Sequence, residues 1–345
     1  PAKVVYERKE TFIASNSRHA TEFKVRMGAS RDGIIRVIDI VGLSDTGAYG
    51  EHAPTVFAVI GDKTMPLYNK TKAIRYQGHA VYTNKLPGGA LRGYGATQGT
   101  FVQESTVNKL AAALGIDPIE LRLKNLIRET ETALYYKGKK LGSSSLHRCI
   151  ETGKTMSGWD AKFPRIEQGN KVRGVGMAVT MQGSGIANID TASAEIRLND
   201  DGFYTVLVGS TDMGTGSDTI LLQMAADVLA ADMDQFIIHA ADTDVSPFDP
   251  GSYASSTTYV TDKAVEQCAE QLKQTICQVG AGLLGLDERA VVFAGDAVTS
   301  EDGTQRATLA QIAAASQCGS NTALEAVVTH SSGISPPPFM VGAAE

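Results

Sequence analysis

Alternating hydrophobic and polar positions dominate the first quarter of the chain and predict β-structure there. Residues 22–29 and 34–41 both alternate, and the turn sequence Ser30-Arg31-Asp32-Gly33 lies between them, so we expect a hairpin. A further extended run over 73–84 leads into a glycine-rich segment at 86–99. The pattern therefore predicts a small sheet that delivers the chain to a glycine-rich loop.

Two helices are expected after this loop. The first should end at Gly115, and the second should begin with Asp117 as its cap and Pro118 in its first turn. Glu120 and Lys124 form an i,i+4 pair on the second helix. The residues expected on the buried face of the first helix are Phe101, Val102, Leu110, Ala111 and Leu114. The apolar surface of the second helix is Leu121, Leu123 and Leu126.

Residues 130–170 are polar and irregular, with one short helix expected over 146–155, and we place a domain boundary in this stretch. The elements expected beyond it are a hairpin around Asp200-Asp201-Gly202, a helix over 219–229, a strand over 235–241 and a helix over 265–276. The inward residues of the helix over 219–229 are expected to be Ile220, Leu221, Met224, Ala225 and Val228.

This order of elements predicts the fold class and the domains. Strands alternating with helices predict an α+β protein of two layered, mixed α/β domains. We expect the first domain over residues 1–160, the second over 161–330, and a return to the first domain over 331–345.

Composition and charge argue against several classes of protein. The 345 residues carry a net charge of −6, which argues against a nucleic-acid partner, and no apolar stretch approaches the length of a membrane span. Four cysteines without a Cys-x-x-Cys pair argue against an iron–sulfur or zinc site in this chain. Free thiols without an export signal predict a cytoplasmic protein. The chain opens with Pro1, so we also expect it to begin inside a longer protein.

Three glycine- and hydroxyl-rich loops could carry chemistry, and each precedes a helix. The first loop, residues 88–95, combines glycines that free backbone N–H groups with the Arg92 cation and the Tyr94 ring. The alternative interpretation of this loop is a tight turn with a structural arginine.

The second and third loops offer other donors. Residues 213–219 could seat an anion on backbone amides at a helix start, or Ser217 could simply cap that helix. Residues 251–258 place five hydroxyl side chains before a helix, to bind phosphates or a heterocycle edge, or to form a solvated Ser/Thr loop. Phosphate-loop, zinc-protease and nucleophile-elbow motifs do not occur, and the six histidines lack metal-ligand spacing.

These loops lie in longer stretches that resemble a known family. The sequence Arg92-Gly93-Tyr94-Gly95-Ala96-Thr97-Gln98, with Glu104-Ser105 and then residues 114–127, resembles the large molybdenum-binding subunit of the xanthine dehydrogenase and aldehyde oxidase family. Residues 29–50, 209–229 and 250–272 are similar to the same subunit, in the same order.

The resemblance implies a cofactor, a reaction and partners. It implies a molybdopterin, usually a cytosine dinucleotide in bacteria, that holds molybdenum between two domains without a protein ligand to the metal. It implies hydroxylation of a heterocycle, aromatic or aldehyde carbon with oxygen from water. Electrons would leave through iron–sulfur clusters and FAD on other domains or subunits.

The resemblance also implies roles for individual residues. Arg92, Gly93, Tyr94 and Gly95 would approach the molybdenum and substrate pocket, with Arg92 and Tyr94 as its catalytic contacts and Tyr94 stacked on the substrate. The pterin would meet Gly214, Thr215 and Gly216. Contacts near the metal centre and the dithiolene would come from Ala254, Ser255, Thr257 and Thr258.

Three departures from the family pattern qualify these roles. Thr215 stands where the family usually carries a glutamine, and residues 56–70 lack the arginine that orients purines, which argues against xanthine as the substrate. The family's Gly-Glu motif near the C-terminus of the subunit, which supplies the catalytic base, is missing, and Glu345 falls in a segment that precedes that motif in the family. We therefore expect an internal piece of a larger enzyme, inactive by itself. The alternative is a non-catalytic cofactor-binding or assembly subunit that needs partner chains.

Overall fold

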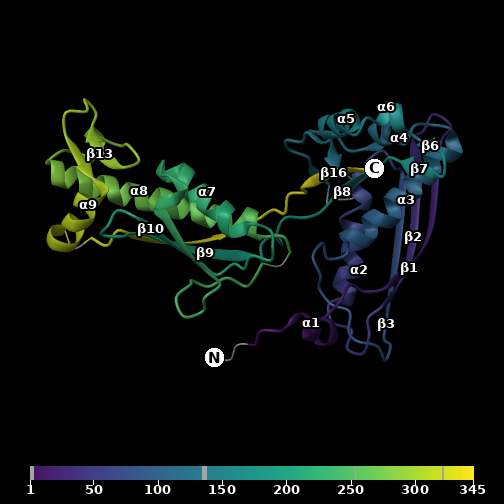
Figure 1. Cartoon of the computed structure of the whole chain (residues 1–345), viewed down its shortest axis with the longest axis horizontal. Helices are drawn as coiled ribbons and strands as arrows, with labels where there is room; N and C mark the ends of the chain where they lie inside the picture. The colour runs from purple at the N-terminus through teal and green to yellow at the C-terminus, as the bar shows by residue number, and fades with distance from the viewer. Residues whose placement is uncertain (1–3, 134–137, 253, 321) are drawn as a thin grey trace. The chain divides into compact units, whose positions relative to one another are not determined.

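The computed structural model describes residues 4–133, 138–252, 254–320 and 322–345. The chain forms two compact units: unit 1 comprises Pro1–Gln182 and Pro337–Glu345, and unit 2 comprises Gly183–Pro336. Both units mix helices with sheets, so the predicted α+β class is confirmed (Figure 1).

Unit 1 is built on the predicted hairpin. Strands β1 (Thr21–Ala29) and β2 (Ile35–Asp45) pair antiparallel, and β3 (Ala73–Val81) adds to β2 in parallel. The parallel step requires a crossover, which α2 (Ala53–Asp62) and the short helix η1 (Met65–Leu67) supply. Helices α2 and α3 (Ala96–Leu114) pack beside this sheet (Figure 1). The glycine-rich first loop lies between β3 and α3, at one end of this layer.

Helix α3 ends at Gly115 as predicted, but its buried face differs from the prediction. Ala111 is buried, whereas the side chain of Phe101 is 75% exposed. Val102, Leu110 and Leu114 are only partly buried and flank the core. The i, i+3, i+4 spacing of the helix instead turns small and polar residues inward. The residues of α3 that are buried are Ala96, Gly99, Gln103, Glu104, Val107 and Ala111.

Helix α4 (Pro118–Asn125) begins where the sequence predicted. The Asp117 carboxylate accepts hydrogen bonds from the N–H groups of Ile119 and Glu120, and Lys124 pairs with Glu120 at 2.7 Å. Leu121 and Leu126 are buried, and Leu123 is half-buried.

The segment over 130–170 is more ordered than predicted. Its expected helix is α5 (Leu146–Ser157), but further short elements accompany it. Their strands are mostly exposed and only two to four residues long, so they leave no alternation to detect. These elements are β4 (Thr132–Ala133), β5 (Lys139–Lys140), α6 (Trp159–Lys162), β6 (Arg165–Gln168) and β7 (Lys171–Gly174). The remaining elements of unit 1 are α1 (Arg8–Ala14), β8 (Gly176–Met181) and β16 (Phe339–Ala344), of which the last two pair antiparallel.

Unit 2 is a sheet of order β11-β10-β9-β15 with two helices on it. The predicted hairpin is β9 with β10, paired antiparallel around Gly202. Helices α7 and α8 are longer than predicted, since α7 begins at Ser217 and α8 continues to Leu284. The bounds are β9 (Thr191–Leu198), β10 (Tyr204–Val208), α7 (Ser217–Leu229), η2 (Met233–Gln235), β11 (Phe236–Ala240), η3 (Thr257–Thr261), α8 (Asp262–Leu284) and β15 (Glu325–Ser331). A smaller part contains η4 (Glu288–Ala290), β12 (Val291–Phe293), β13 (Ala297–Ser300), β14 (Arg306–Thr308), α9 (Leu309–Ala315) and η5 (Ser316–Ser320).

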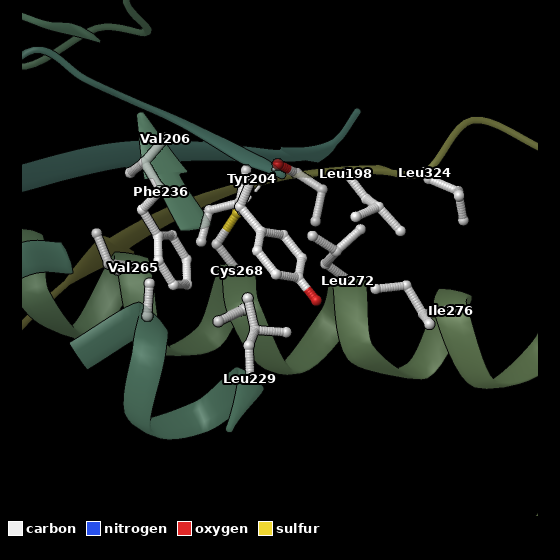
Figure 2. Close-up of a cluster of buried hydrophobic side chains, with 14 of the residues drawn as sticks. Leu198, Tyr204, Val206, Leu229, Phe236, Val265, Cys268, Leu272, Ile276 and Leu324 are labelled. Carbon is white, nitrogen blue, oxygen red and sulfur yellow. Dashed lines mark hydrogen bonds between the residues drawn. The ribbon is translucent and has the colours of Figure 1, made fainter. Parts of the chain in front are cut away.

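The core of unit 2 lies between α8 and the sheet. Figure 2 shows side chains of α8, among them Cys268 and Leu272, directed at Tyr204 of β10, whose ring stacks on Phe236 with centroids 5.0 Å apart. Cys268 is fully buried and Cys277 packs against the same core.

Two further expectations concern the whole chain. The division between the units falls after residues 182 and 336, because residues 161–182 pack with unit 1. The bounds 1–160, 161–330 and 331–345 of the family domains stay a prediction. No helix in the described part of the chain is long and apolar enough to cross a membrane.

Candidate functional site

The first loop (residues 88–95) contains three consecutive residues with positive φ, a backbone conformation that needs support from neighbouring residues. Gly93, Tyr94 and Gly95 have φ angles of +94°, +40° and +95°, immediately before α3 begins. The left-handed φ of Tyr94 costs on the order of 1 kcal/mol, because its Cβ crowds the backbone. A Cβ on Gly95 would lie 2.2 Å from the Val56 carbonyl oxygen, so this glycine lets the loop rest directly on α2.

Two side chains from distant segments hold the carbonyl groups of the first loop. Arg18 Nη2 donates to the Arg92 carbonyl at 2.6 Å, and Gln182 Nε2 donates to the Gly93 carbonyl at 2.9 Å. Arg18 precedes β1 and Gln182 follows β8, so the loop is fixed by segments on both sides of it in the sequence. The loop is therefore a pre-formed element of unit 1 and not merely a solvated turn.

The N–H groups of the first loop differ in their partners. Those of Gly88 and Gly89 donate to the carbonyls of Thr46 and Ser17, outside the loop. Those of Tyr94 and Ala96 close turns within the loop. Those of Arg92, Gly93 and Gly95 have no hydrogen-bond partner among the residues that the structure describes. The Arg92 side chain is exposed and forms no ion pair with any described residue. Free N–H donors beside a free guanidinium suit an anion or an oxo group.

Tyr94 is oriented by a residue that the sequence did not single out for this site. His52 Nδ1 lies 2.7 Å from the Tyr94 hydroxyl, and the two rings meet edge-to-face with centroids 5.7 Å apart. His52 is the N-cap of α2 and has a left-handed φ of 52°. Burial raises the pKa of the Tyr94 phenol, so this ring stays neutral at physiological pH. The contact fixes an aromatic face beside Arg92.

The second loop (residues 213–219) does not leave its backbone N–H groups open as the sequence predicted. Asp212 Oδ1 accepts hydrogen bonds from the N–H groups of Gly214, Thr215 and Gly216 at 2.7, 2.8 and 3.3 Å. A carboxylate of the chain thus fills the expected anion seat. The alternative expectation of a Ser217 cap is also wrong, because Gly216 is the N-cap of α7 and no side chain caps this helix.

Two buried serine hydroxyls at or near the second loop lack hydrogen-bond partners within the described chain. Ser210 and Ser217 are 1% and 2% exposed, and neither Oγ has a hydrogen-bond partner within the described chain. Such groups are rare in native proteins and indicate a partner that the protein itself does not supply. Burial, and then the nearby Asp212 carboxylate, raise the pKa of Asp218 at the start of α7. The second loop thus has two unpartnered buried hydroxyls and a carboxyl group of raised pKa in or beside it.

The third loop (residues 251–258) is joined to the segment just before the second loop, within unit 2. Ser252 Oγ accepts from the Thr211 N–H at 2.8 Å and donates to the Thr211 carbonyl at 2.9 Å. Ala254 and Ser255 both have left-handed φ angles, of 56° and 58°, and the Ala254 carbonyl accepts from the Gly185 N–H.

The hydroxyl groups of the third loop lie where a helix begins. Thr257 opens the π-helical turn η3, which runs into α8, and Thr258 follows it. Ser255 and Thr258 are exposed, and Thr257 is half-buried. Tyr253 of this loop lies outside the described residues. The Ser252–Thr211 hydrogen bonds thus bring the third loop beside the start of the second within unit 2.

Sequence reasoning missed the residues that hold these loops. Arg18, His52, Gln182 and Ser252 act across long sequence separations, so no local pattern signals them. Asp212 could have been found, because an Asp two residues before a Gly-x-Gly turn is a common partner for the amides of that turn.

Neither a metal-ligand cluster nor Glu345 as a catalytic base adds a functional site among the described residues. The described residues contain no group of three or more His, Cys, Asp or Glu side chains placed to hold a metal ion. Glu345 pairs with Lys162 at 2.5 Å and with Arg173 at 3.5 Å, and the Lys162 ammonium lowers the pKa of this carboxylate. A carboxylate held by two cations is a weak base.

Comparison with known proteins places both units in one family. Two family models, both described as molybdopterin cofactor-binding domain, match this chain, one over residues 1–126 and the other over residues 152–344. The putative xanthine dehydrogenase molybdenum-binding subunit of Escherichia coli is 38% identical over 289 residues, which are 82% of this chain and 38% of that protein. The probable hypoxanthine oxidase of the same organism is 34% identical, over 83% of this chain and 30% of that protein.

A solved structure has the same fold. The quinoline 2-oxidoreductase from Pseudomonas putida superposes with a TM-score of 0.82 and 22% identity, over 99% of this chain and 46% of that one. The chain thus spans less than half the length of each of these proteins.

Proposed function

The chain belongs to the molybdopterin cofactor-binding domain family, and from this premise we propose that it is the cofactor-binding portion of a molybdenum hydroxylase. The whole enzyme would hydroxylate a heterocycle, aromatic or aldehyde carbon with oxygen from water. This chain contributes binding groups, and the catalytic base comes from another segment.

The observation that carries the proposal is the set of free donors in the first loop. The N–H groups of Arg92, Gly93 and Gly95 lack partners among the described residues, and the loop is already held in shape. Donors fixed before binding need no reorganisation, which is how oxyanion-type sites gain their strength. Arg92 adds a charged donor, and Tyr94 adds a flat face on which an aromatic substrate can stack.

Unit 2 offers the groups that a pterin needs. The buried, unpartnered Ser210 and Ser217 hydroxyls suit the polar edges of a pterin and its phosphates. The hydroxyls of Ser255, Thr257 and Thr258 in the third loop add further donors and acceptors. Gly214, Thr215 and Gly216 would meet the cofactor through their exposed faces, because Asp212 occupies their N–H groups. Ala254 would contribute its backbone.

The bound group would supply the redox chemistry. When bound, the molybdenum cofactor provides oxygen transfer and accepts two electrons. The residues of this chain hold and orient the cofactor and the substrate. We propose the cytosine dinucleotide form of the cofactor, iron–sulfur and FAD partners on other domains or subunits, a small-molecule substrate and a cytoplasmic location.

The proposal is tested on the complex that contains this chain, purified from its own host. The complex is incubated in isotopically labelled water with a panel of N-heterocycles, aromatic compounds and aldehydes. We expect labelled oxygen in a hydroxylated product, no turnover by the isolated chain, and a loss of about tenfold or more in Arg92→Ala, which removes a charge-assisted donor. Product oxygen that comes from dioxygen, or no product with any compound, would refute the proposal.

A further inference from the structure

Arg18 is the least expected contact of the first loop. Its guanidinium reaches across 74 residues of sequence to the Arg92 carbonyl, with Nη2 donating at 2.6 Å. Its Nη1 donates to Thr97 Oγ1 at 2.7 Å and to Gln98 Oε1 at 3.3 Å. One planar group therefore joins the loop to the first turn of α3.

The bond to the Arg92 carbonyl controls an N–H group on the next residue. Carbonyl and N–H of one trans peptide point in opposite directions and rotate together. Holding the Arg92 carbonyl therefore sets the direction of the Gly93 N–H, which is one of the free donors. The glycine at 93 has a φ of +94° and offers little resistance to rotation of this peptide, so the restraint must come from outside.

The neighbouring peptide is held in a different way. Gln182 binds the Gly93 carbonyl, and the N–H of that same peptide, on Tyr94, closes a turn onto the Leu91 carbonyl. That peptide has three restraints, because its carbonyl also accepts from the Ala96 N–H at 2.9 Å, whereas the Arg92–Gly93 peptide has Arg18 alone among the described residues. The direction of the Gly93 donor thus depends on Arg18.

We propose that Arg18 is a positioning residue that aims the Gly93 N–H at the ligand of the first loop. The identity of that ligand as the molybdenum cofactor or its substrate rests on the proposed function. A lysine cannot reproduce the effect, because a single ammonium lacks the planar fork that joins Arg92 to Thr97.

The first test measures amide hydrogen exchange in the full chain, in Arg18→Ala, Arg18→Lys and Arg26→Ala. Arg26 is the matched control, since it is an exposed arginine of β1 whose partner Asp39 keeps a second partner in Arg75. We expect segment 91–98 to exchange about tenfold faster in both Arg18 variants, as loss of charge-assisted hydrogen bonds implies. Exchange in β1–β3 and in the control should be unchanged. Should Arg18→Ala fail to fold, Arg18→Lys decides. Wild-type exchange in a folded Arg18→Lys overturns the proposal.

The second test separates this inference from the proposed function. The molybdenum EPR spectrum of the dithionite-reduced native complex is recorded for wild type, Arg18→Lys and Arg26→Ala. We expect a shifted spectrum in Arg18→Lys alone, at unchanged molybdenum content. A wild-type complex without molybdenum refutes the proposed function and leaves the exchange result standing. A molybdenum-replete Arg18→Lys complex with a faster-exchanging loop and the wild-type spectrum overturns the positioning role.

Discussion

Arg122 and Glu104 form an ion pair inside unit 1, with 2.8 Å between Arg122 Nε and Glu104 Oε2 and side chains 0% and 4% exposed. The Tyr68 hydroxyl and the Val179 N–H also donate to this carboxylate. Arg122 donates further to the Pro118 carbonyl. The pair therefore joins α3, α4 and β8, the elements on which the first loop and Gln182 are mounted.

Breaking this pair should destabilise unit 1 strongly. Glu104→Ala leaves the Arg122 guanidinium buried without its counter-charge, which costs about 3–5 kcal/mol. The measurement is the free energy of unfolding in urea. The control is Glu120→Ala, which removes the exposed pair with Lys124 and should cost less than about 1 kcal/mol. Equal losses in the two variants would contradict the role assigned to the buried pair.

His52 and Tyr94 should be energetically coupled. Tyr94→Phe, His52→Ala and the double variant form a cycle in which a single hydrogen bond is shared. We expect a coupling free energy of about 0.5–1.5 kcal/mol in unfolding experiments. Additive effects would show that the 2.7 Å contact does not orient the ring in solution.

The second loop should loosen in acid. Burial alone would raise the pKa of Asp212, but the N–H groups of Thr215, Gly214 and Gly216 outweigh it and lower the pKa below the ordinary value of 3.8. A lowered folded pKa stabilises the loop above the unfolded pKa, and this contribution is lost as the pH falls through the folded value.

The amide NMR shifts of Gly214 and Thr215 report this transition. We expect both to titrate together with a midpoint below 3.8, and the titration to vanish in Asp212→Asn. A midpoint above 3.8 would mean that the carboxylate does not accept these hydrogen bonds.

Thr215 should tolerate the residue that its family usually carries. Thr215 is exposed, and its N–H is already bound by Asp212, so a longer side chain can reach the cofactor without rebuilding the loop. Thr215→Gln in the native complex should retain pterin through gel filtration as well as wild type, or better by about 0–2 kcal/mol. Clear loss of pterin would show that the loop is shaped around threonine, and the placement of this loop on the pterin would be wrong.

Local signals in the sequence were good guides to elements and poor guides to contacts. The cap at Asp117 and the turn at Gly202 are short-range features, and both elements form as predicted. The prediction that Phe101 lies on the buried face of α3 was wrong. Hydrophobicity alone could not show that Gln103 and Glu104 are buried in unit 1 instead, where hydrogen bonds and an ion pair satisfy their polar groups.

The same contrast between local features and tertiary contacts holds for the candidate site. Its glycine-rich loops were visible in the sequence, whereas Arg18 on Arg92 is a product of tertiary folding across 74 residues. That Asp212 fills the second loop follows from a turn motif that the anion-seat interpretation overlooked. Loops can thus be located from composition, but which of their donors remain free depends on the fold.

The decisive measurement for the proposal that this chain binds a molybdenum cofactor is the cofactor content of the native complex. The complex that contains this chain is purified from its host, and its molybdenum is measured by elemental analysis and its pterin by fluorescence after release. If the chain is the cofactor-binding portion of a molybdenum hydroxylase, we expect molybdenum and pterin in equimolar amounts to this chain. A folded, complete complex that contains neither would contradict the proposal.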